Sequence, residues 1–246
     1  MKKTISVITL IPRSSRFYAE QVQALFGQWA QVHSYSTGDR SVEGIVESDL
    51  YLLSTDAFED AQEARRYVPS DGQVVEIQLT YPKEVIQDLK RIPRGTRVLF
   101  VNATRQMARE AITQLEQLGV NQIGFEPYGP DSPVPEGLDI AVTPDEAGFV
   151  PPGMKKVINI GHRPCTPGTM IEAAIRLGLE GLLEEKQFQN YMKTMASGNY
   201  SFDEMFARSR KMESRFDILL EILDEGMVGV NEKGEVYACN QKAKEI

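Results

Sequence analysis

The chain has 246 residues, of which 41% are hydrophobic and 25% are charged. This balance is that of an ordinary globular protein and excludes a disordered chain as the default. The 35 acidic residues outnumber the 27 basic residues, and the formal net charge is −8. Because no stretch gathers the basic residues into a run, direct nucleic-acid binding by this part of the chain is not expected.

The first ten residues contain a short apolar stretch that Pro12 and Arg13 interrupt. It is too short for the apolar region of a signal peptide, and no later run is long enough to span a membrane. The two cysteines, Cys165 and Cys239, are too few and too far apart for a disulfide framework or a metal-ligand pattern. These features predict a cytoplasmic protein without membrane contact.

Short apolar runs rich in β-branched residues alternate with segments of helical spacing. The expected strands are 4–10, 32–35, 50–53, 74–79, 97–101, 123–125, 140–142 and 157–160. The expected helices are the one with Tyr18, Val22, Leu25 and Trp29 on one face, followed by 42–46, 58–67, 82–89 and 106–118. This alternation is typical of βα units around parallel sheets.

The strands at 74–79 and 157–160 bracket an internal set of βα units. A chain that crosses to a second lobe and then returns produces such a bracket. We therefore expect an α/β fold in which residues 1–195 form two Rossmann-like lobes with parallel sheets. Lobe one comprises about 1–78 and 157–195, and lobe two about 79–156.

Two capping boxes predict helix starts in the last third of the chain, at Thr169 to Glu172 and at Ser201 to Glu204. In the second helix, apolar or small residues recur at alternating steps of four and three: Met205, Ser209, Met212, Phe216, Leu219 and Leu223. This heptad spacing favours pairing with a second copy of the chain. The run covers fewer than three heptads, so an amphipathic helix packed on its own domain is an equal alternative.

A β-hairpin is expected after this helix. Asp224-Glu225-Gly226 breaks the helix, and two short apolar runs flank the glycine-containing turn at 231–234. Asn240 can cap the short helical stretch that follows.

The residues from 216 onward resemble the beginning of a PAS domain. The resemblance lies in Asp224-Glu225-Gly226, in the turn at 231–234, and in Asn240 with Ala243. Residues 1–195 resemble the PrpR-type N-terminal receptor domain, through the crossing strand at 74–79, the helix after it, the strand at 97–101 and the return at 157–160. Together these parts resemble the front half of sigma-54-dependent, NtrC-class transcription activators.

This resemblance implies a receptor domain at 1–195, a connecting signal helix at 196–223 and a truncated PAS domain at 224–246. It also implies that the receptor controls a downstream ATPase and DNA-binding domain, which would contact sigma-54 RNA polymerase and DNA. The chain contains no phosphate-binding loop, no dinucleotide fingerprint and no zinc-hydrolase motif. We therefore expect neither an enzymatic activity nor a cofactor in this part, and a homodimer through the 201–223 helix.

Ligands of open parallel sheets bind beyond the carboxyl ends of the strands, so the loops after the strands form the candidate site. The candidate residues are Arg13, Ser14, Ser54, Thr55, Asn102, Thr104, Arg105, Tyr128, Thr143, His162, Arg163 and Thr166. An arginine beside a helix N-terminus can hold a carboxylate or phosphate, as at Arg13 and Arg105. Ordinary helix caps and turns would use the same residue types.

His162 and Cys165 stand three residues apart in the most concentrated polar loop. A thiol near a histidine can form a nucleophile pair, but this spacing fixes no geometry and no orienting group is evident. We expect a receptor in which a small metabolite, such as an organic acid, binds between the lobes and favours their closure. A small α/β enzyme or a ligand-free dimerisation scaffold is the alternative.

Overall fold

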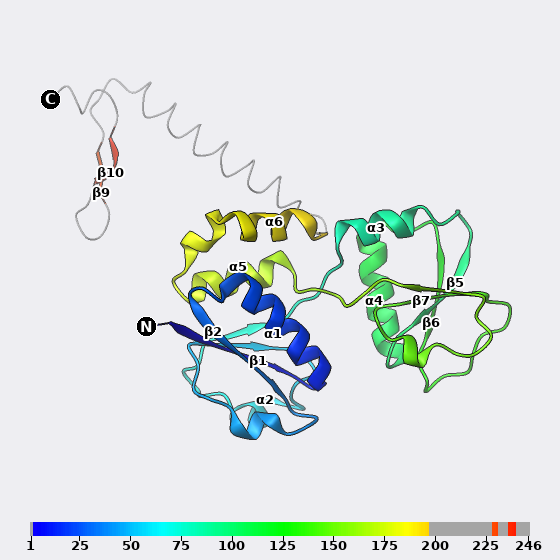
Figure 1. Cartoon of the computed structure of the whole chain (residues 1–246), viewed down its shortest axis with the longest axis horizontal. Coiled ribbons are helices and arrows are strands. Elements are labelled where there is room, and N and C mark those ends of the chain that lie inside the picture. Colours follow the sequence, from blue (N-terminus) through cyan, green and yellow to red (C-terminus); the bar gives the residue numbers. More distant parts are fainter. Residues whose placement is uncertain (1, 197–227, 231–235, 240–246) are drawn as a thin grey trace. The chain divides into compact units, whose positions relative to one another are not determined.

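The computed structural model describes residues 2–196, 228–230 and 236–239. The chain divides into two units, Met1–Asn199 and Tyr200–Ile246. The first unit contains two α/β lobes, each built on a four-stranded sheet in which all strands are parallel (Figure 1). The two parallel-sheet lobes predicted from the sequence are thereby confirmed.

Lobe one has the strand order β2-β1-β3-β4. Its strands are β1 (Lys3–Thr9), β2 (Ala30–Ser36), β3 (Leu50–Leu53) and β4 (Val74–Glu76). The last five residues of β1 are buried, because helices cover one face of this strand and loops cover the other.

The helices of lobe one are α1 (Pro12–Phe26), α5 (Pro167–Arg176) and α6 (Lys186–Thr194), which lie on the same side of the sheet (Figure 1). The rings of Phe26 and Phe188 meet edge to face between α1 and α6, with centroids 6.0 Å apart. The other face packs on η1 (Ser41–Gly44) and on the loops around α2 (Ala61–Ala64). The predicted helices 42–46 and 58–67 are therefore single turns.

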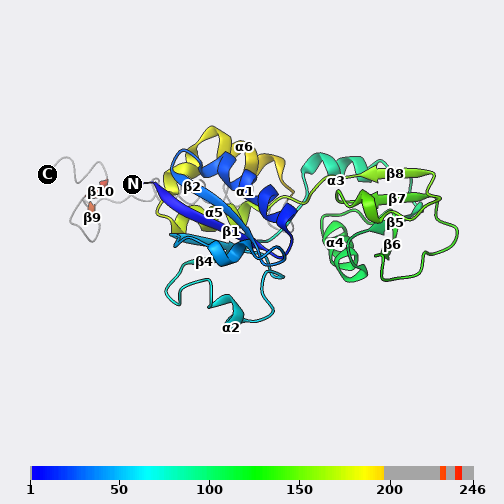
Figure 2. The ribbon, with the colours of Figure 1, turned by 60° about the horizontal axis from the view of Figure 1, so that its bottom comes forward.

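Lobe two has the order β6-β5-β7-β8 (Figure 2). Its strands are β5 (Arg97–Val101), β6 (Gly124–Tyr128), β7 (Ile140–Thr143) and β8 (Lys156–Asn159). Its core lies between the sheet and the helices α3 (Lys83–Lys90) and α4 (Arg105–Gln117), with Val98, Phe100 and Leu115 fully buried. On the opposite face, Val150 and Met154, just after η2 (Ala147–Phe149), pack against buried residues of β5 and β7.

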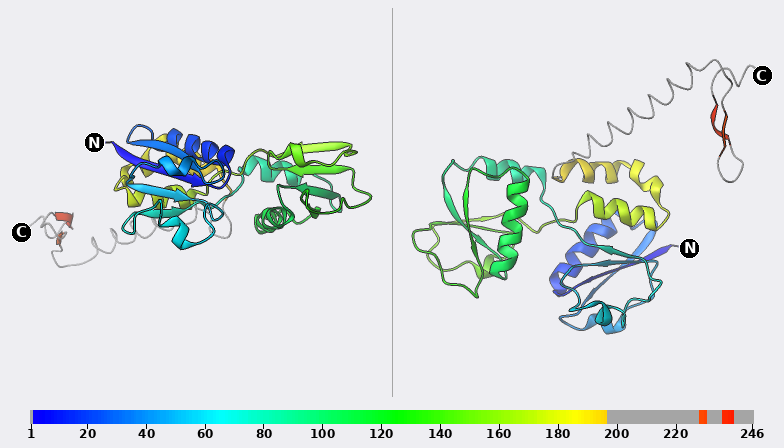
Figure 3. Two further views of the ribbon diagram at one scale, coloured as in Figure 1. Left: turned by 90° about the horizontal axis from the view of Figure 1, so that it is seen from below. Right: turned by 180° about the vertical axis from the view of Figure 1, so that it is seen from behind.

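Two crossing segments, 77–82 and 160–166, connect the lobes (Figure 3). They run antiparallel and are hydrogen bonded to each other, from Thr80 N to Pro164 O at 2.8 Å and from Thr166 N to Gln78 O at 2.6 Å. The backbone of residue 196 joins them, because Ala196 N donates to Tyr81 O at 2.8 Å. The three passages of the chain thus form one hydrogen-bonded hinge region.

The lobe boundary at residue 157 is wrong. β8 pairs with β7 from Ile140↔Lys156 to Thr143↔Asn159, so it extends the sheet of lobe two. The chain returns to lobe one only after Ile160, where Gly161 adopts the left-handed conformation with φ 72°. The short η2 connection brings β8 back beside β7, and the apolar run itself does not reveal its sheet partner.

The capping box at Thr169 is also wrong. Thr166 is the N-cap of α5, and its side chain accepts a hydrogen bond from Thr169 N at 3.1 Å. Thr169 lies in the first turn, where its hydroxyl accepts from Gln78 N at 3.1 Å. Pro167 at the first position of the helix fixes this earlier start.

In the second unit, β9 (Val228–Val230) and β10 (Val236–Cys239) pair antiparallel. The predicted helix at 201–223, the turn at 231–234 and the cap at Asn240 lie outside the described residues, so the PAS assignment stays a prediction. Within the described ranges, no helix has the length and apolar character needed to cross a membrane.

Candidate functional site

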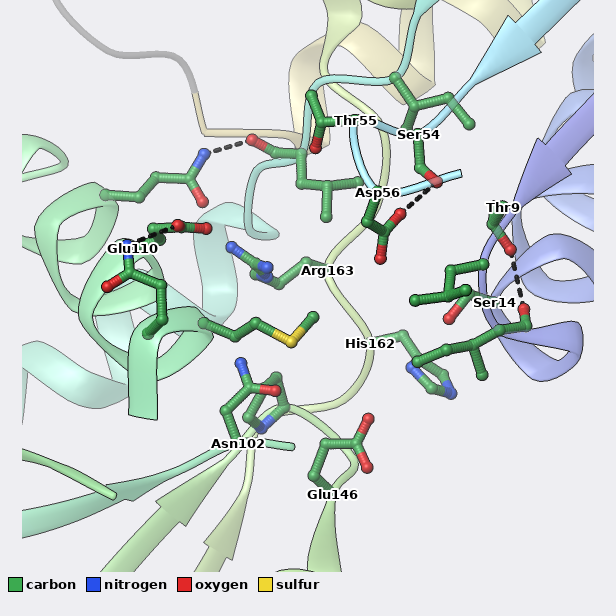
Figure 4. A pocket seen from close by; sticks show the side chains of 18 of the residues that line it. Thr9, Ser14, Ser54, Thr55, Asp56, Asn102, Glu110, Glu146, His162 and Arg163 are labelled. Carbon is green, nitrogen blue, oxygen red and sulfur yellow. Dashed lines mark hydrogen bonds between the residues drawn. The ribbon is translucent and has the colours of Figure 1, made fainter. Parts of the chain in front are cut away.

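A cavity of about 830 Å³ opens between the lobes of the first unit (Figure 4). Its walls are the loops after β1 and β3 in lobe one, the loops after β5 and β7 together with α4 in lobe two, and the crossing segments. Both sheets therefore contribute the carboxyl ends of their strands, where open α/β sheets bind ligands. The volume lies within the range of small-molecule sites.

Half of the residues predicted from the sequence line this cavity. They are Ser14, Ser54, Thr55, Asn102, His162 and Arg163. They come together because each follows a strand or, for His162 and Arg163, lies on the return crossing between the two sheets. The rule that loops after parallel strands converge thus locates the cavity correctly.

The remaining predicted residues lie outside the cavity lining. Thr104 and Thr166 cap α4 and α5. Thr143 is fully buried, and its hydroxyl accepts a hydrogen bond from Glu146 N at 3.0 Å. Tyr128 packs in the core on the far face of the lobe-two sheet. These four residues have the cap, turn and packing roles that the same sequence pattern allowed.

The two arginines expected to hold an anion, Arg13 and Arg105, also lie outside the lining. The backbone N–H of Arg105 donates to Asp131 at 3.3 Å, so a carboxylate of the chain already lies at the N-terminus of α4. The side chain of Arg13 forms an ion pair with Asp145 beside the cavity.

Asp145 is held by contacts from three directions. Its backbone is in the left-handed region with φ 67°, which aspartate tolerates better than most residues. One carboxylate oxygen accepts from Asn159 Nδ2 at 2.9 Å, and the other contacts Arg13 and His162 Nε2, the latter at 2.8 Å. The Asn159 hydrogen bond, with the charges of His162 and Arg13, lowers the pKa of Asp145.

Arg163 places a positive charge inside the cavity. Its side chain is half-buried and forms no ion pair with any residue in the described part of the chain. The guanidinium lies near Tyr81, where it opposes the burial that raises the pKa of Tyr81 to about 12. A guanidinium without a carboxylate partner can donate a bidentate pair of hydrogen bonds to an anion.

Three carboxylates share the same cavity: Asp56, Glu110 and Glu146. Asp56 accepts a hydrogen bond from the hydroxyl of Ser54, and Glu110 accepts one from Gln106 Nε2 at 2.9 Å. Glu146 is half-buried, and this burial raises its pKa even though Arg13 and His162 act in the opposite direction. The cavity therefore offers both positive and negative side chains to a ligand.

The side of the cavity that α4 forms was not predicted from the sequence. Its cavity face consists mainly of polar residues at helical spacing, namely Gln106, Arg109, Glu110, Thr113 and Gln117. Such a stripe looks the same in sequence whether it faces solvent or a cavity. Tyr18 was placed on the packed face of its helix, yet it also lines the cavity, and burial raises the pKa of its hydroxyl.

The surroundings of Cys165 and His162 do not suit the nucleophile pair considered from the sequence. Cys165 is fully buried, and burial raises the pKa of its thiol to about 12. The His162 side chain contacts Asp145 through Nε2, and its ring packs at a tilt against Phe17 with centroids 4.6 Å apart. Within the described ranges, no group of three or more histidine, cysteine or acidic side chains could hold a metal ion.

Comparisons of the chain with protein-family models, with curated proteins and with solved structures give no match. The resemblances to the PrpR-type receptor domain and to the PAS domain therefore stay predictions. The physical grounds for a function are the interlobe cavity and its charged side chains.

Proposed function

We propose that this chain is the effector-sensing part of a sigma-54-dependent transcription activator and that it binds a small metabolite in the interlobe cavity. The binding role rests on one observation: the half-buried Arg163, which pairs with no acid among the described residues, lies in a cavity of about 830 Å³ between two parallel sheets. A desolvated guanidinium is costly unless an anion compensates it. A ligand with a carboxylate would supply that compensation.

A ligand in this cavity favours closure of the lobes because its contacts come from both of them. Ser54 and Thr55 follow β3 of lobe one, whereas Asn102 follows β5 of lobe two. Only the closed arrangement offers all these contacts at once, so binding shifts the population toward it.

The hinge region gives this shift a route toward the rest of the protein. The crossing segment 77–82 pairs with 160–166 and also with residues 195–196, where Thr80 Oγ1 donates to Ala196 O at 2.7 Å. A change in the angle between the lobes would therefore move the backbone of residues 195–196. In the proposed cytoplasmic regulator, the predicted 201–223 helix follows this point and pairs two copies of the chain. The PAS domain and the downstream ATPase and DNA-binding domains come after that helix.

Two features favour binding over the alternatives. Catalysis by the cysteine needs a thiolate, and the burial of Cys165 opposes its formation. A ligand-free scaffold would have a filled interface between its lobes, whereas this cavity is lined by polar and charged side chains.

The test is thermal unfolding of the 246-residue chain against a panel of small carboxylic acids, phosphates and amino acids. A ligand that binds only the folded state adds about 2.7 kcal/mol of stability at a hundred times its dissociation constant. Arg163→Gln should abolish the shift, and Arg94→Gln, at an exposed position away from the cavity, should preserve it. The absence of any shift across the panel would favour the scaffold.

A further inference from the structure

The residues that line the cavity carry charges of both signs. Asp56, Glu110 and Glu146 line it together with Arg109 and Arg163. Figure 4 shows Asp56, Glu146 and Arg163 all extending into the cavity, Asp56 and Glu146 from loops of different lobes and Arg163 from the return crossing. A ligand that touches Arg163 therefore also meets carboxylates.

None of these three carboxylates forms an ion pair with a side chain in the part of the chain that the structure describes. The hydrogen-bond donors to Asp56 and Glu110 are the neutral groups of Ser54 and Gln106. Glu146 is half-buried, and this burial raises its pKa although Arg13 and His162 act in the opposite direction. Glu146 therefore has room for a positive ligand group as a direct partner.

We propose, on the basis of the receptor function above, that the ligand is a small zwitterion of the α-amino acid class. Its carboxylate binds Arg163, and its ammonium group binds Glu146. The flat guanidinium suits a carboxylate, and an ammonium donates three hydrogen bonds to carboxylate oxygens.

A dicarboxylate or a phosphate fits this cavity less well. Its second negative charge would approach the carboxylates that line the same cavity, where partial exclusion of water strengthens the repulsion. A zwitterion satisfies Arg163 and Glu146 together. The hydroxyl of Tyr18 and the amide N–H groups of Asn102 also line the cavity and are neutral groups that can bind a polar ligand side chain.

The test is isothermal titration of the 246-residue chain with matched triplets of an α-amino acid, its deaminated acid and its decarboxylated amine. The amino acid should bind at least tenfold more tightly than either relative. In Glu146→Gln, the amino acid should bind about tenfold more weakly and the deaminated acid more tightly, because the ammonium loses its partner while the carboxylate loses a repulsion. Glu116→Gln, on the exposed side of α4, should change neither affinity.

The outcomes separate the two proposals. Tight binding of dicarboxylates or phosphates without binding of amino acids overturns the zwitterion and leaves the receptor function standing. Equal weakening of the amino acid and the deaminated acid in Glu146→Gln, with an unchanged circular dichroism spectrum, overturns the role of Glu146 in binding an ammonium. A complete lack of binding by all three members of every triplet and by the anions overturns both proposals.

Discussion

Arg13, at the start of α1, forms an ion pair with Asp145, which follows β7 in the other lobe. The same carboxylate contacts His162 on the return crossing, with 2.8 Å between Nε2 and Oδ2. These partners come from both lobes and from the crossing between them. In the lobe movement proposed above, this pair would act as a clasp that favours the closed arrangement.

Arg13→Ala should open the clasp without unfolding the protein. The Arg13 side chain is 62% exposed, so its loss should change the free energy of unfolding by less than about 1 kcal/mol. Small-angle X-ray scattering should show a larger radius of gyration without ligand, and any ligand should bind more weakly because the closed state is less populated. Arg16→Ala, one turn away on α1, is the control and should leave both quantities unchanged. A scattering curve for Arg13→Ala identical to that of the wild type would contradict the clasp.

The stability that Asp145 contributes should depend on pH in a defined direction. Its pKa in the folded protein is lowered by the Asn159 hydrogen bond and by the charges of His162 and Arg13. The contribution is therefore full above the ordinary aspartate pKa of about 3.9 and is lost as the pH falls through the lowered value. In urea unfolding, Asp145→Asn should be less stable than the wild type at pH 7, and the difference should shrink toward pH 3. A difference that stays constant over this range would refute the assignment.

The neighbouring Glu146 should show the opposite behaviour. Burial raises its pKa in the folded protein, so the stability linked to its protonated form is present below the ordinary glutamate pKa and is lost as the pH rises through the raised value. Glu146→Gln should therefore raise the unfolding midpoint at pH 7 in the absence of ligand and have no effect near pH 4. Glu116→Gln should be neutral at both values. A destabilised Glu146→Gln at pH 7 would show that the carboxylate is already compensated.

Cys165 should be unreactive in the folded protein. Its side chain is fully buried, and its pKa is raised to about 12, so almost no thiolate exists at pH 8. In a Cys239→Ser background, where Cys165 is the only cysteine, iodoacetamide should label the chain only after urea unfolds it. Rapid labelling of the folded chain would revive the enzymatic alternative.

The local part of the fold could be predicted because local patterns determine it. The apolar runs at 50–53 and 97–101 coincide with β3 and β5, and the 106–118 helix differs from α4 by one residue at each end. The sheet to which β8 belongs could not be predicted, because its apolar run fits an edge of either sheet and does not show that it pairs with β7.

The candidate site was predicted in position and only partly in composition. The strand-end rule found Ser54, Asn102 and Arg163, since that rule depends on topology. It could not identify Glu110, because a polar helix face gives the same sequence pattern in water and in a cavity. Arg13 was expected to bind a ligand. In the folded chain it forms an ion pair with Asp145.

The hydrogen bond from Thr80 to residue 196 should be essential to the hinge region. Thr80 is 2% exposed, and its hydroxyl donates to Ala196 O at 2.7 Å. Thr80→Val keeps the shape but leaves a buried carbonyl without this donor, so it should lower the free energy of unfolding by about 1–3 kcal/mol in chemical denaturation. Thr96→Val removes an exposed bond of the same kind, from Thr96 Oγ1 to Pro93 O at 2.7 Å, and should cost less than about 0.5 kcal/mol. Equal losses in the two variants would mean that burial at the hinge does not strengthen the bond, and residue 196 would then be only loosely coupled to the angle between the lobes.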